Sequence, residues 1–171
     1  MGDEKHCGFV AFIGEPNVGK STLLNHMVGS KISIVTHKVQ TTRSRIRGVA
    51  INGTSQIVFV DTPGLFKPRR RLDRAMVKSA WSEALEADII VFLVEANKGL
   101  TEGVKYNLEK LQESSTSASS IILVINKIDR VKSQILLKLT EELYEEYQFE
   151  ETFFISATKG YGTTELKNWI S

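Results

Sequence analysis

The sequence predicts an α/β fold: a six-stranded, mostly parallel sheet with one antiparallel strand and helices on both faces. Short runs rich in β-branched and aromatic residues alternate with segments of helical periodicity, which is typical of doubly wound parallel sheets. Several of these runs are apolar throughout, as expected for strands that helices cover on both faces. The strand candidates are residues 9–13, 46–51, 56–60, 88–94, 121–125 and 152–155.

The antiparallel strand is predicted by the link between the second and third strand candidates. Only Asn52-Gly53-Thr54-Ser55 joins them. Parallel strands need a much longer crossover, whereas Asn-Gly is a strong hairpin signal. We therefore expect this one pair to be antiparallel.

Helices are predicted where apolar residues recur every three or four positions. The clearest stripes are Leu72, Met76, Ala80 and Ala84, and Leu136, Leu139, Leu143 and Tyr147. Further helices are expected to begin near Gly19 and to span residues 163–170, and the Ser-rich residues 114–120 are expected to form a loop. We assign Trp81 and Trp169 to the core rather than to partner contacts, because aromatic side chains on such stripes are usually buried.

Length and composition indicate one folded domain. The chain has 171 residues, of which 42% are hydrophobic and 25% charged, and this excludes a disordered or collagen-like protein. The longest apolar run, residues 89–94, is too short to span a bilayer, and the first residues lack the apolar segment of a secretion signal. Cys7 is the only cysteine and excludes an internal disulfide, so we expect a cytoplasmic protein.

The charge is unevenly distributed along the chain. The net charge is +2, yet residues 31–78 hold eleven Lys or Arg against Asp61 and Asp73, a local charge of +9 that leaves −7 for the remainder. Such polarity suggests that one face meets an anionic partner. The alternative is a solvated surface on which the charges cluster by chance.

The strongest motif follows the first predicted strand. Residues 14–21, Gly-Glu-Pro-Asn-Val-Gly-Lys-Ser, match G-x-x-x-x-G-K-[ST]. In such a phosphate loop backbone N–H groups face phosphate oxygens, and the next helix adds its positive end. We expect Lys20 to reach the β- and γ-phosphates and Ser21 to bind Mg²⁺. The alternative is a Gly-rich turn, and the motif alone does not separate ATP from GTP.

A second motif, Asp61-Thr-Pro-Gly64, ends the third predicted strand. A carboxylate at the tip of a buried strand beside a phosphate loop can hold Mg²⁺ through its coordination shell. The backbone N–H of Gly64 would meet a γ-phosphate there. Alone, these four residues are simply a good turn.

Two further motifs point to guanine. After the fifth strand, in the motif that ends at Asp129, this carboxylate would accept hydrogen bonds from guanine N1–H and the exocyclic amine, a pair of donors that adenine lacks. Asn126 would brace the loops and the Lys127 stem would cover a base face. After the sixth strand, a backbone N–H near Ala157 would donate to guanine O6. Each motif alone could be an ordinary loop, but four in this order predict a guanine-nucleotide site.

Together these motifs resemble those of the Era family of bacterial ribosome-assembly GTPases, a TrmE-Era-EngA-like group of translation-factor-type G domains. The matching segments are residues 7–9, 14–25, 31–33, 40–43, 45–46, 61–65, 126–129 and 156–157. Residues 40–43, Gln-Thr-Thr-Arg, are more specific than the phosphate loop, which very many NTPases share. The resemblance runs through essentially the whole chain and implies a P-loop NTPase G domain over residues 1–171.

The resemblance implies two switch segments that respond to GTP, one over residues 30–45 and one after Gly64. Thr42 would bind Mg²⁺, with Thr41 as the alternative because the sequence does not show which hydroxyl points inward. Leu65 stands where Ras-like enzymes carry the glutamine that orients the attacking water, so we expect slow intrinsic hydrolysis.

Asn17 resembles the asparagine with which relatives coordinate K⁺, which implies that K⁺ stimulates hydrolysis more than Na⁺; the alternative is a loop-stabilising residue. Catalytic roles fall to Lys20, Thr42 and Gly64, and metal ligation to Ser21, Thr42 and Asp61 for Mg²⁺ and to Asn17 for K⁺. Contacts to GTP or GDP fall to Asn17, Val18, Gly19, Lys20, Ser21, Thr22, Asp61, Asn126, Lys127, Asp129, Ser156, Ala157 and Thr158.

The resemblance further implies hydrolysis of GTP to GDP and phosphate, and a nucleotide switch in small ribosomal subunit assembly through 16S rRNA maturation. Family members carry a C-terminal KH domain that binds the 3′ end of this rRNA. This chain ends at Ser171 without the G-x-x-G clamp of a KH module, so we expect an isolated G-domain fragment or a natural truncation. We expect a monomer and no DNA partner. A weak peripheral association with the inner membrane is reported for the family, but no basic amphipathic helix supports it.

Two other functions stay open on the sequence. One is a nucleotide-dependent binding module with negligible turnover, which Leu65 favours. The other is an ATPase, and this alternative depends on whether Asp129 selects guanine.

Overall fold

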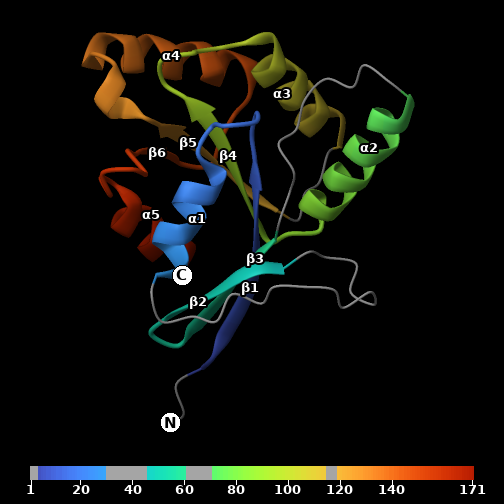
Figure 1. The fold of residues 1–171 in the computed structure, drawn as a ribbon, viewed down its shortest axis with the longest axis vertical. Helices are drawn as coiled ribbons and strands as arrows, with labels where there is room; N and C mark the ends of the chain where they lie inside the picture. The colour runs from blue at the N-terminus through green and yellow to red at the C-terminus, as the bar shows by residue number, and fades with distance from the viewer. Residues whose placement is uncertain (1–3, 30–45, 61–70, 115–118) are drawn as a thin grey trace.

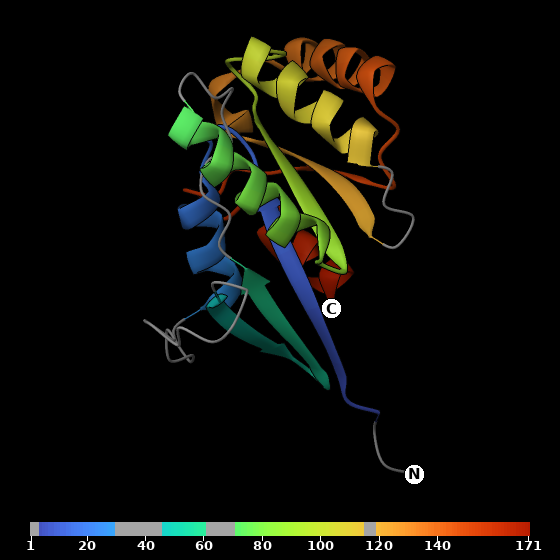
Figure 2. The same cartoon turned by 90° about the vertical axis from the view of Figure 1, so that its right-hand side faces the viewer.

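The computed structural model describes residues 4–29, 46–60, 71–114 and 119–171. They form one sheet between two layers of helices (Figures 1 and 2). The elements are β1 (His6–Ile13), α1 (Lys20–Val28), β2 (Ile46–Asn52), β3 (Ser55–Val60), α2 (Arg71–Leu85), β4 (Ile89–Glu95), α3 (Glu102–Ser114), β5 (Ser120–Asn126), the 3-10 turn η1 (Ile128–Arg130), α4 (Ser133–Glu146), β6 (Thr152–Phe154) and α5 (Thr163–Ile170). Within these described ranges, no helix combines the length and apolarity needed to cross a membrane.

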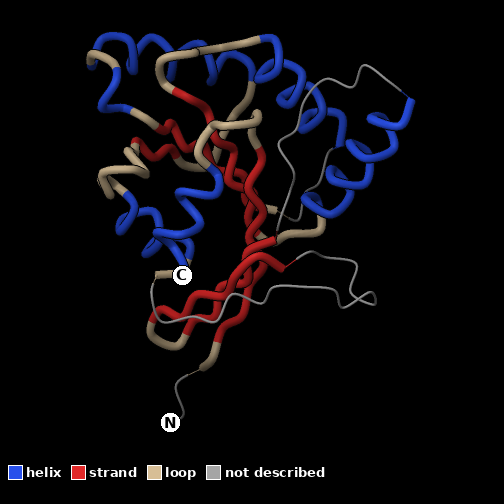
Figure 3. The backbone as a smooth tube through the Cα atoms, in the orientation of Figure 1, coloured by secondary structure: helices blue, strands red, loops and turns tan. Residues whose placement is uncertain are grey.

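The sheet has the strand order β2-β3-β1-β4-β5-β6, and Figure 3 shows its strands in red. The pairs from β3 through β1, β4 and β5 to β6 are parallel. Among the described strands, β2 and β3 are the one antiparallel pair, with Asn52 opposite Ser55 across a turn in which Gly53 has φ 59°. The predicted α/β fold with one antiparallel strand is therefore confirmed.

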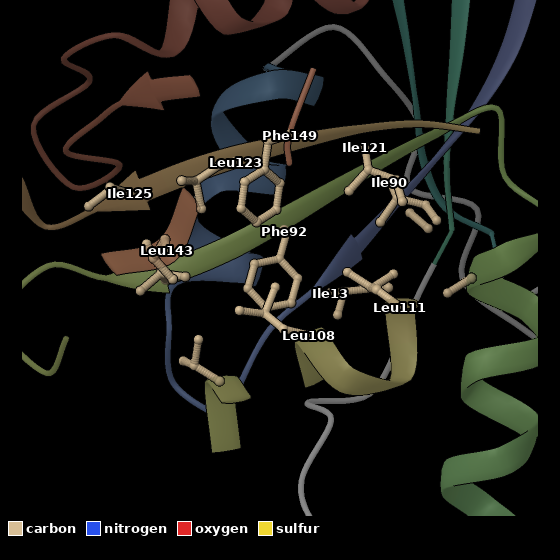
Figure 4. Packing of buried hydrophobic residues seen from close by; sticks show 14 of the residues in the cluster. Ile13, Ile90, Phe92, Leu108, Leu111, Ile121, Leu123, Ile125, Leu143 and Phe149 are labelled. Atoms are coloured by element: carbon tan, nitrogen blue, oxygen red, sulfur yellow. The ribbon is translucent and has the colours of Figure 1, made fainter. Parts of the chain in front are cut away.

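Each face of the sheet is buried under its own helices. Along β4, Ile90, Phe92 and Val94 belong to the core beneath α2, α3 and α4, part of which Figure 4 shows. Val91 and Leu93 belong to the core beneath α1 and α5. A buried Leu, Ile, Val or Phe side chain contributes about 1.5–3 kcal/mol, and burial on both faces explains why the strand sequences do not alternate.

Helix α3 was not among the predicted helices. Its buried side chains Val104, Leu108 and Leu111 have helical spacing, but Gly103 and the fully buried Asn107 interrupt the apolar pattern. The helix begins after Thr101, whose hydroxyl accepts a hydrogen bond from the backbone N–H of Val104 at 3.1 Å, as an N-cap residue does.

The two tryptophans differ in burial. Trp81 is 7% exposed and packs in the core, as predicted. The assignment of Trp169 to the core is wrong: its side chain is 37% exposed and makes an edge contact with Phe153 at 5.9 Å. Helix α5 has only eight residues and buries Thr163, Leu166 and Ile170, so Trp169 lies beside its buried stripe. In α2, the side chains of Leu72, Met76 and Ala80 lie outside the description.

The carboxyl ends of β1, β4, β5 and β6 meet at one edge of the sheet. Phe92 is the partner of Ile13, Glu95 of Asn126, and Phe154 of Ile125. The loops that follow these strands therefore lie next to each other, and such an edge is where doubly wound folds bind ligands.

Candidate functional site

Residues 14–19 turn the chain between β1 and α1. Asn17 (φ 63°) and Gly19 (φ 107°) both adopt left-handed backbone conformations. Such residues in a tight turn direct neighbouring N–H groups into a concavity that suits an anion. Helix α1 begins directly behind it at Lys20 and carries no acidic residue in its first turn, so its positive end faces the turn uncompensated. The segment is suited to bind phosphate.

The two glycines of this loop are required by close contacts. A Cβ at Gly19 would lie 2.2 Å from Asn126 Nδ2, and one at Gly14 would lie 2.9 Å from the carbonyl oxygen of Leu93. Both distances are far below a van der Waals contact. The spacing of the motif thus lets the loop pack closely against β4 and against the end of β5.

The side chains of the loop have different exposures. Lys20 Nζ donates to the carbonyl oxygens of Gly14 at 2.8 Å and Glu15 at 3.1 Å, so the ammonium group folds back over the loop. Ser21 and Thr22 are exposed in the first turn of α1. Val18 is buried in the core, which leaves only its backbone to contact a ligand.

Asn126 joins three loops. It is the last residue of β5 and is 1% exposed. Its Nδ2 donates to the carbonyl oxygen of Val18 at 2.9 Å. Its Oδ1 accepts from the backbone N–H groups of Lys127 at 2.8 Å and Ala157 at 3.0 Å. Asn126 therefore braces the loops, as its position predicts.

Lys127 links the same loops through its charge. Its Nζ donates to the carbonyl oxygen of Asn17 at 3.0 Å and lies 3.0 Å from Oε2 of Glu95, which also has Lys98 Nζ at 3.3 Å. Burial acts to raise the pKa of the Glu95 carboxyl, but the close approach and positive charges of Lys127 and Lys98 outweigh it and hold the pKa below its ordinary value. Both contacts are ion pairs, because Oε2 makes no hydrogen bond of ordinary geometry within the described part of the chain.

Asp129 is exposed in η1, with Lys159 Nζ 3.8 Å from its Oδ2. The Ser156 hydroxyl lowers the pKa of the Asp129 carboxyl most, and the charges of Lys159 and Arg130 lower it further. Ser156 acts by proximity, because its buried Oγ makes no hydrogen bond of ordinary geometry within the described part of the chain. The carboxylate is thus kept ionised.

The loop after β6 contains the other predicted base contacts. Ser156 and Ala157 are buried, whereas Thr158 is exposed. The N–H of Ala157, which we expected near guanine O6, donates to Asn126. Among the described residues, the N–H of Thr158 makes no hydrogen bond, and it is the neighbouring donor.

A family model described as 50S ribosome-binding GTPase matches residues 9–127, more than half of the chain. The chain belongs to this family of GTPases. The matched segment contains the phosphate loop, Glu95 and Asn126, and it ends at Lys127, before Asp129.

Curated relatives are named GTPase Era. The protein of Dinoroseobacter shibae is 65% identical over 163 residues, which cover 95% of this chain and 53% of the relative. A Bradyrhizobium protein is 53% identical over 99% of this chain and 54% of its own length. The chain spans about half the length of the curated relatives it matches. The resemblance to the Era GTPases is confirmed over this length.

Two solved structures are similar to this chain as well. Era in complex with MgGDPNP and nucleotides 1506–1542 of 16S ribosomal RNA has a TM-score of 0.79 at 37% identity, over 98% of this chain and 56% of that one. A variant of Aquifex aeolicus Era bound to GDP·AlF4⁻ has a TM-score of 0.76 at 37% identity, over 96% and 56%.

Sequence reasoning missed two side chains that support the candidate site. Glu95 contacts Lys127, and its signal was a carboxylate that ends the otherwise apolar strand β4. Glu15 Oε2 accepts from the Thr101 hydroxyl at 2.8 Å, which ties the phosphate loop to the start of α3. A single acid in a loop motif gives no comparable signal.

Several predicted residues lie outside the described residues. They are Thr41, Thr42, Asp61, Gly64 and Leu65. Of the predicted Mg²⁺ ligands, only Ser21 is described. No group of three or more His, Cys, Asp or Glu side chains within the described ranges could hold a metal ion.

Proposed function

We propose that this chain is the GTP-binding domain of a GTPase that hydrolyses GTP to GDP and phosphate and acts as a nucleotide switch in small ribosomal subunit assembly. The carrying observation is the hydrogen-bond network of Asn126, which joins the phosphate loop to the loops after β5 and β6. Neither the phosphate loop nor residues 126–129 alone specify a guanine nucleotide. Side by side, they form one site with hydrogen-bond donors at one end and an acceptor at the other. The GTPase family of the chain supports this function.

The phosphate end of the site fits a nucleoside triphosphate. Gly14 and Gly19 allow the close packing of the loop, and Lys20 with the positive end of α1 supplies the charge that the β- and γ-phosphates need. The exposed hydroxyl of Ser21 would bind Mg²⁺. When bound, this ion neutralises phosphate charge.

The base end fits guanine rather than adenine. Asp129 would accept from N1–H and the exocyclic amine, and the lowered pKa keeps its carboxylate ionised at neutral pH. With the N–H of Ala157 donating to Asn126, we assign the donor to guanine O6 to the neighbouring Thr158 N–H. The Lys127 stem would cover one face of the base.

Hydrolysis would follow from positioning and charge stabilisation rather than covalent catalysis. Lys20 stabilises charge on the phosphates, and we assign further contacts to Thr42, Asp61 and Gly64. Asn17 is exposed, and its carbonyl oxygen accepts from Lys127; we assign K⁺ binding to its side-chain oxygen. We expect faster turnover in K⁺ than in Na⁺, and equal turnover at matched ionic strength would contradict it.

We also propose the wider setting of the domain. Residues 1–171 form the GTP-binding domain of a cytoplasmic monomer, whose KH domain would lie beyond this chain. Its RNA partner would be the rRNA of the small subunit, supported by the solved Era complex with a 16S rRNA fragment. The basic segment of residues 31–78 would face that RNA in a manner that depends on the nucleotide.

A titration with GDP, GTP and ATP in Mg²⁺ and K⁺ tests the guanine assignment. We expect GTP to bind at least about 100-fold more tightly than ATP, and Asp129→Asn to abolish most of this preference. Glu141→Gln, which neutralises an exposed carboxylate on α4, is the control and should leave it unchanged. An unaltered preference in Asp129→Asn would show that the assignment is wrong.

The second candidate is a binding module with negligible turnover, favoured by Leu65 in place of a water-orienting glutamine. Single-turnover hydrolysis of GTP with and without K⁺ separates the two functions. A switch enzyme shows slow, K⁺-stimulated release of phosphate. A binding module shows tight GTP binding and no release in either salt.

A further inference from the structure

Glu95 is a buried acid whose position is fixed by its backbone. It ends β4 and is 5% exposed. Asn126 is its partner on β5, and the N–H of the next residue, Ala96, donates to the carbonyl oxygen of Asn126 at 2.9 Å. The carbonyl oxygen of Glu95 accepts from the N–H groups of Lys98 and Gly99 at 3.2 and 3.1 Å. The backbone of Glu95 is therefore held on both sides, by β5 and by the turn that follows β4.

The carboxylate of Glu95 needs a partner because burying an unpaired charge is costly. Its Oε2 lies 3.0 Å from Lys127 Nζ and 3.3 Å from Lys98 Nζ. The Lys98 side chain is 53% exposed and that of Lys127 only 19%. The less exposed pair is the stronger one, since solvent screens it less.

Glu95 contacts the ammonium group of Lys127, and this group connects Lys127 to Asn17. Among the described residues, Asn17 (φ 63°) and Lys127 (φ 62°) are the non-glycine residues with positive φ. Lys127 Nζ donates to the carbonyl oxygen of Asn17, so one hydrogen bond joins these two positions. Backbone in this region persists where the surroundings enforce it.

We propose that Glu95 is a positioning residue for the guanine nucleotide. Its carboxylate holds the Lys127 ammonium against Asn17 and so fixes residues 14–19 relative to residues 126–129. This role rests on the proposed function for the ligand, while the fixing of the two loops is a property of the chain itself. It goes beyond the phosphate and base motifs, which do not include β4.

Glu95→Gln tests this role because it removes the charge and keeps the shape. We expect the GDP analogue with a fluorescent ribose label to dissociate about tenfold faster, and the KM for GTP to rise with little change in kcat, since ground-state and transition-state binding suffer equally. Two controls should stay within about twofold: Glu102→Gln, whose exposed carboxylate lies 3.9 Å from Lys105, and Lys98→Met, which removes the partner of Glu95 that does not touch Asn17. An unchanged dissociation rate in Glu95→Gln would overturn the proposal.

A double-mutant cycle separates positioning from a merely structural role. If Glu95 acts through Lys127, then Glu95→Gln should add nothing to the dissociation rate in a Lys127→Met background. Additive effects would show that Glu95 acts by another route. Should Glu95→Gln fail to fold, Glu95→Asp is the second variant, because it keeps the charge but places it farther from Lys127. We expect the labelled GDP analogue to dissociate from Glu95→Asp faster than from the wild type, by less than about tenfold.

Hydrogen exchange without nucleotide keeps this proposal distinct from the proposed function. In Glu95→Gln, amides of residues 17–20 and 127–129 should exchange faster than in the wild type, while amides of α4 should be unaffected. Unchanged exchange at both loops overturns the fixing of the loops even if GTP binds. Faster exchange in a chain that binds no guanine nucleotide would instead contradict the proposed function alone.

Discussion

The phosphate loop and the base loops use their backbones in opposite ways. In the phosphate loop the carbonyl oxygens are held from inside: those of Gly14 and Glu15 accept from Lys20, that of Asn17 from Lys127, and that of Val18 from Asn126. The N–H of Val18 also bonds within the loop, to the carbonyl oxygen of Glu15 at 3.4 Å. The left-handed conformations of Asn17 and Gly19 direct N–H groups of the loop into a concavity that suits an anion. The loop thus offers donors to an anion.

In the base loops three N–H groups are held inside instead, whereas that of Thr158 makes no hydrogen bond among the described residues. Those of Lys127 and Ala157 donate to Asn126 Oδ1, and that of Ile128 donates to the carbonyl oxygen of Ile155 at 3.2 Å. The acceptor there is the carboxylate of Asp129, whose side chain is 21% exposed. A phosphate chain needs donors and the guanine edge needs an acceptor, so the two regions are complementary to opposite ends of one nucleotide. The Asn126 amide serves both, with its NH₂ group toward one and its oxygen toward the other.

The largest expected effect is that of Asn126→Ala, because this substitution removes the hydrogen bonds that hold both the phosphate loop and the base loops. The carbonyl of Val18 and the N–H groups of Lys127 and Ala157 lose a buried partner. At about 1–3 kcal/mol for each unsatisfied group, and with partial access of water, we expect a loss of about 4 kcal/mol in the free energy of unfolding. Urea unfolding measures it.

The matched control is Asn168→Ala, which removes an amide whose oxygen accepts from Asn52 on the exposed surface. It should change stability by less than about 0.5 kcal/mol. Similar losses of unfolding free energy in the two variants would mean that the buried hydrogen bonds of Asn126 stabilise the fold no more than an exposed one.

Gly19→Ala should disturb the phosphate loop and leave the base loops in place. A methyl group there would meet Asn126 Nδ2 at 2.2 Å, and φ 107° is unfavourable for alanine. We expect the free energy of unfolding to fall by about 3 kcal/mol, because of backbone strain and displacement of Asn126. The affinities for GDP and for ATP should fall by the same factor. Urea unfolding and nucleotide titration measure the two effects.

Gly53→Ala isolates the conformational part of that cost. Gly53 also has positive φ, at 59°, but a Cβ there would have no neighbour within 4 Å. Its cost should be about 1 kcal/mol. If both alanine variants lose the same stability, the contact with Asn126 does not explain the glycine at position 19.

The sequence predicted what depends on chain-local patterns and missed what depends on strand order. The phosphate loop, Asn126 and Asp129 each follow a strand within a short motif, and the hairpin at Gly53 needed only four residues. Glu95 and Lys127 are distant in sequence, and they meet only because β4 and β5 are neighbours in register. Helix α3 was missed because Asn107 lies within its apolar stripe, and the exposure of Trp169 followed from the shortness of α5.

A smaller effect is expected for Thr101→Val. This variant removes a contact to a side chain of the phosphate loop, Glu15, and leaves the backbone contacts of the loop in place. The hydroxyl caps α3 and donates to Glu15. We expect a loss of about 1 kcal/mol in the free energy of unfolding, and GDP affinity within about twofold of the wild type, because no carbonyl of the loop is released. Thermal unfolding and titration measure them.

Thr140→Val is the control for the loss of a hydroxyl. Thr140 Oγ1 donates to the carbonyl oxygen of Leu136 inside α4 at 2.7 Å, a bond that adds little to helix stability. An equal loss in both variants would show that capping and the contact with Glu15 are not the cause at Thr101.

The smallest effect is the pH dependence of the link between the two regions. The pKa of Glu95 is lowered in the folded protein from its ordinary value of 4.5, so the stability contributed by its carboxylate is fully present above that value and is lost as pH falls through the folded pKa. Protonated Glu95 resembles glutamine in shape and charge. The difference in unfolding free energy between the wild type and Glu95→Gln should therefore stay constant from pH 7 to pH 5 and shrink below pH 4.5. Urea unfolding at each pH measures it, and a difference that grows with acidity would mean that Lys127 and Lys98 do not hold the ionised form of Glu95.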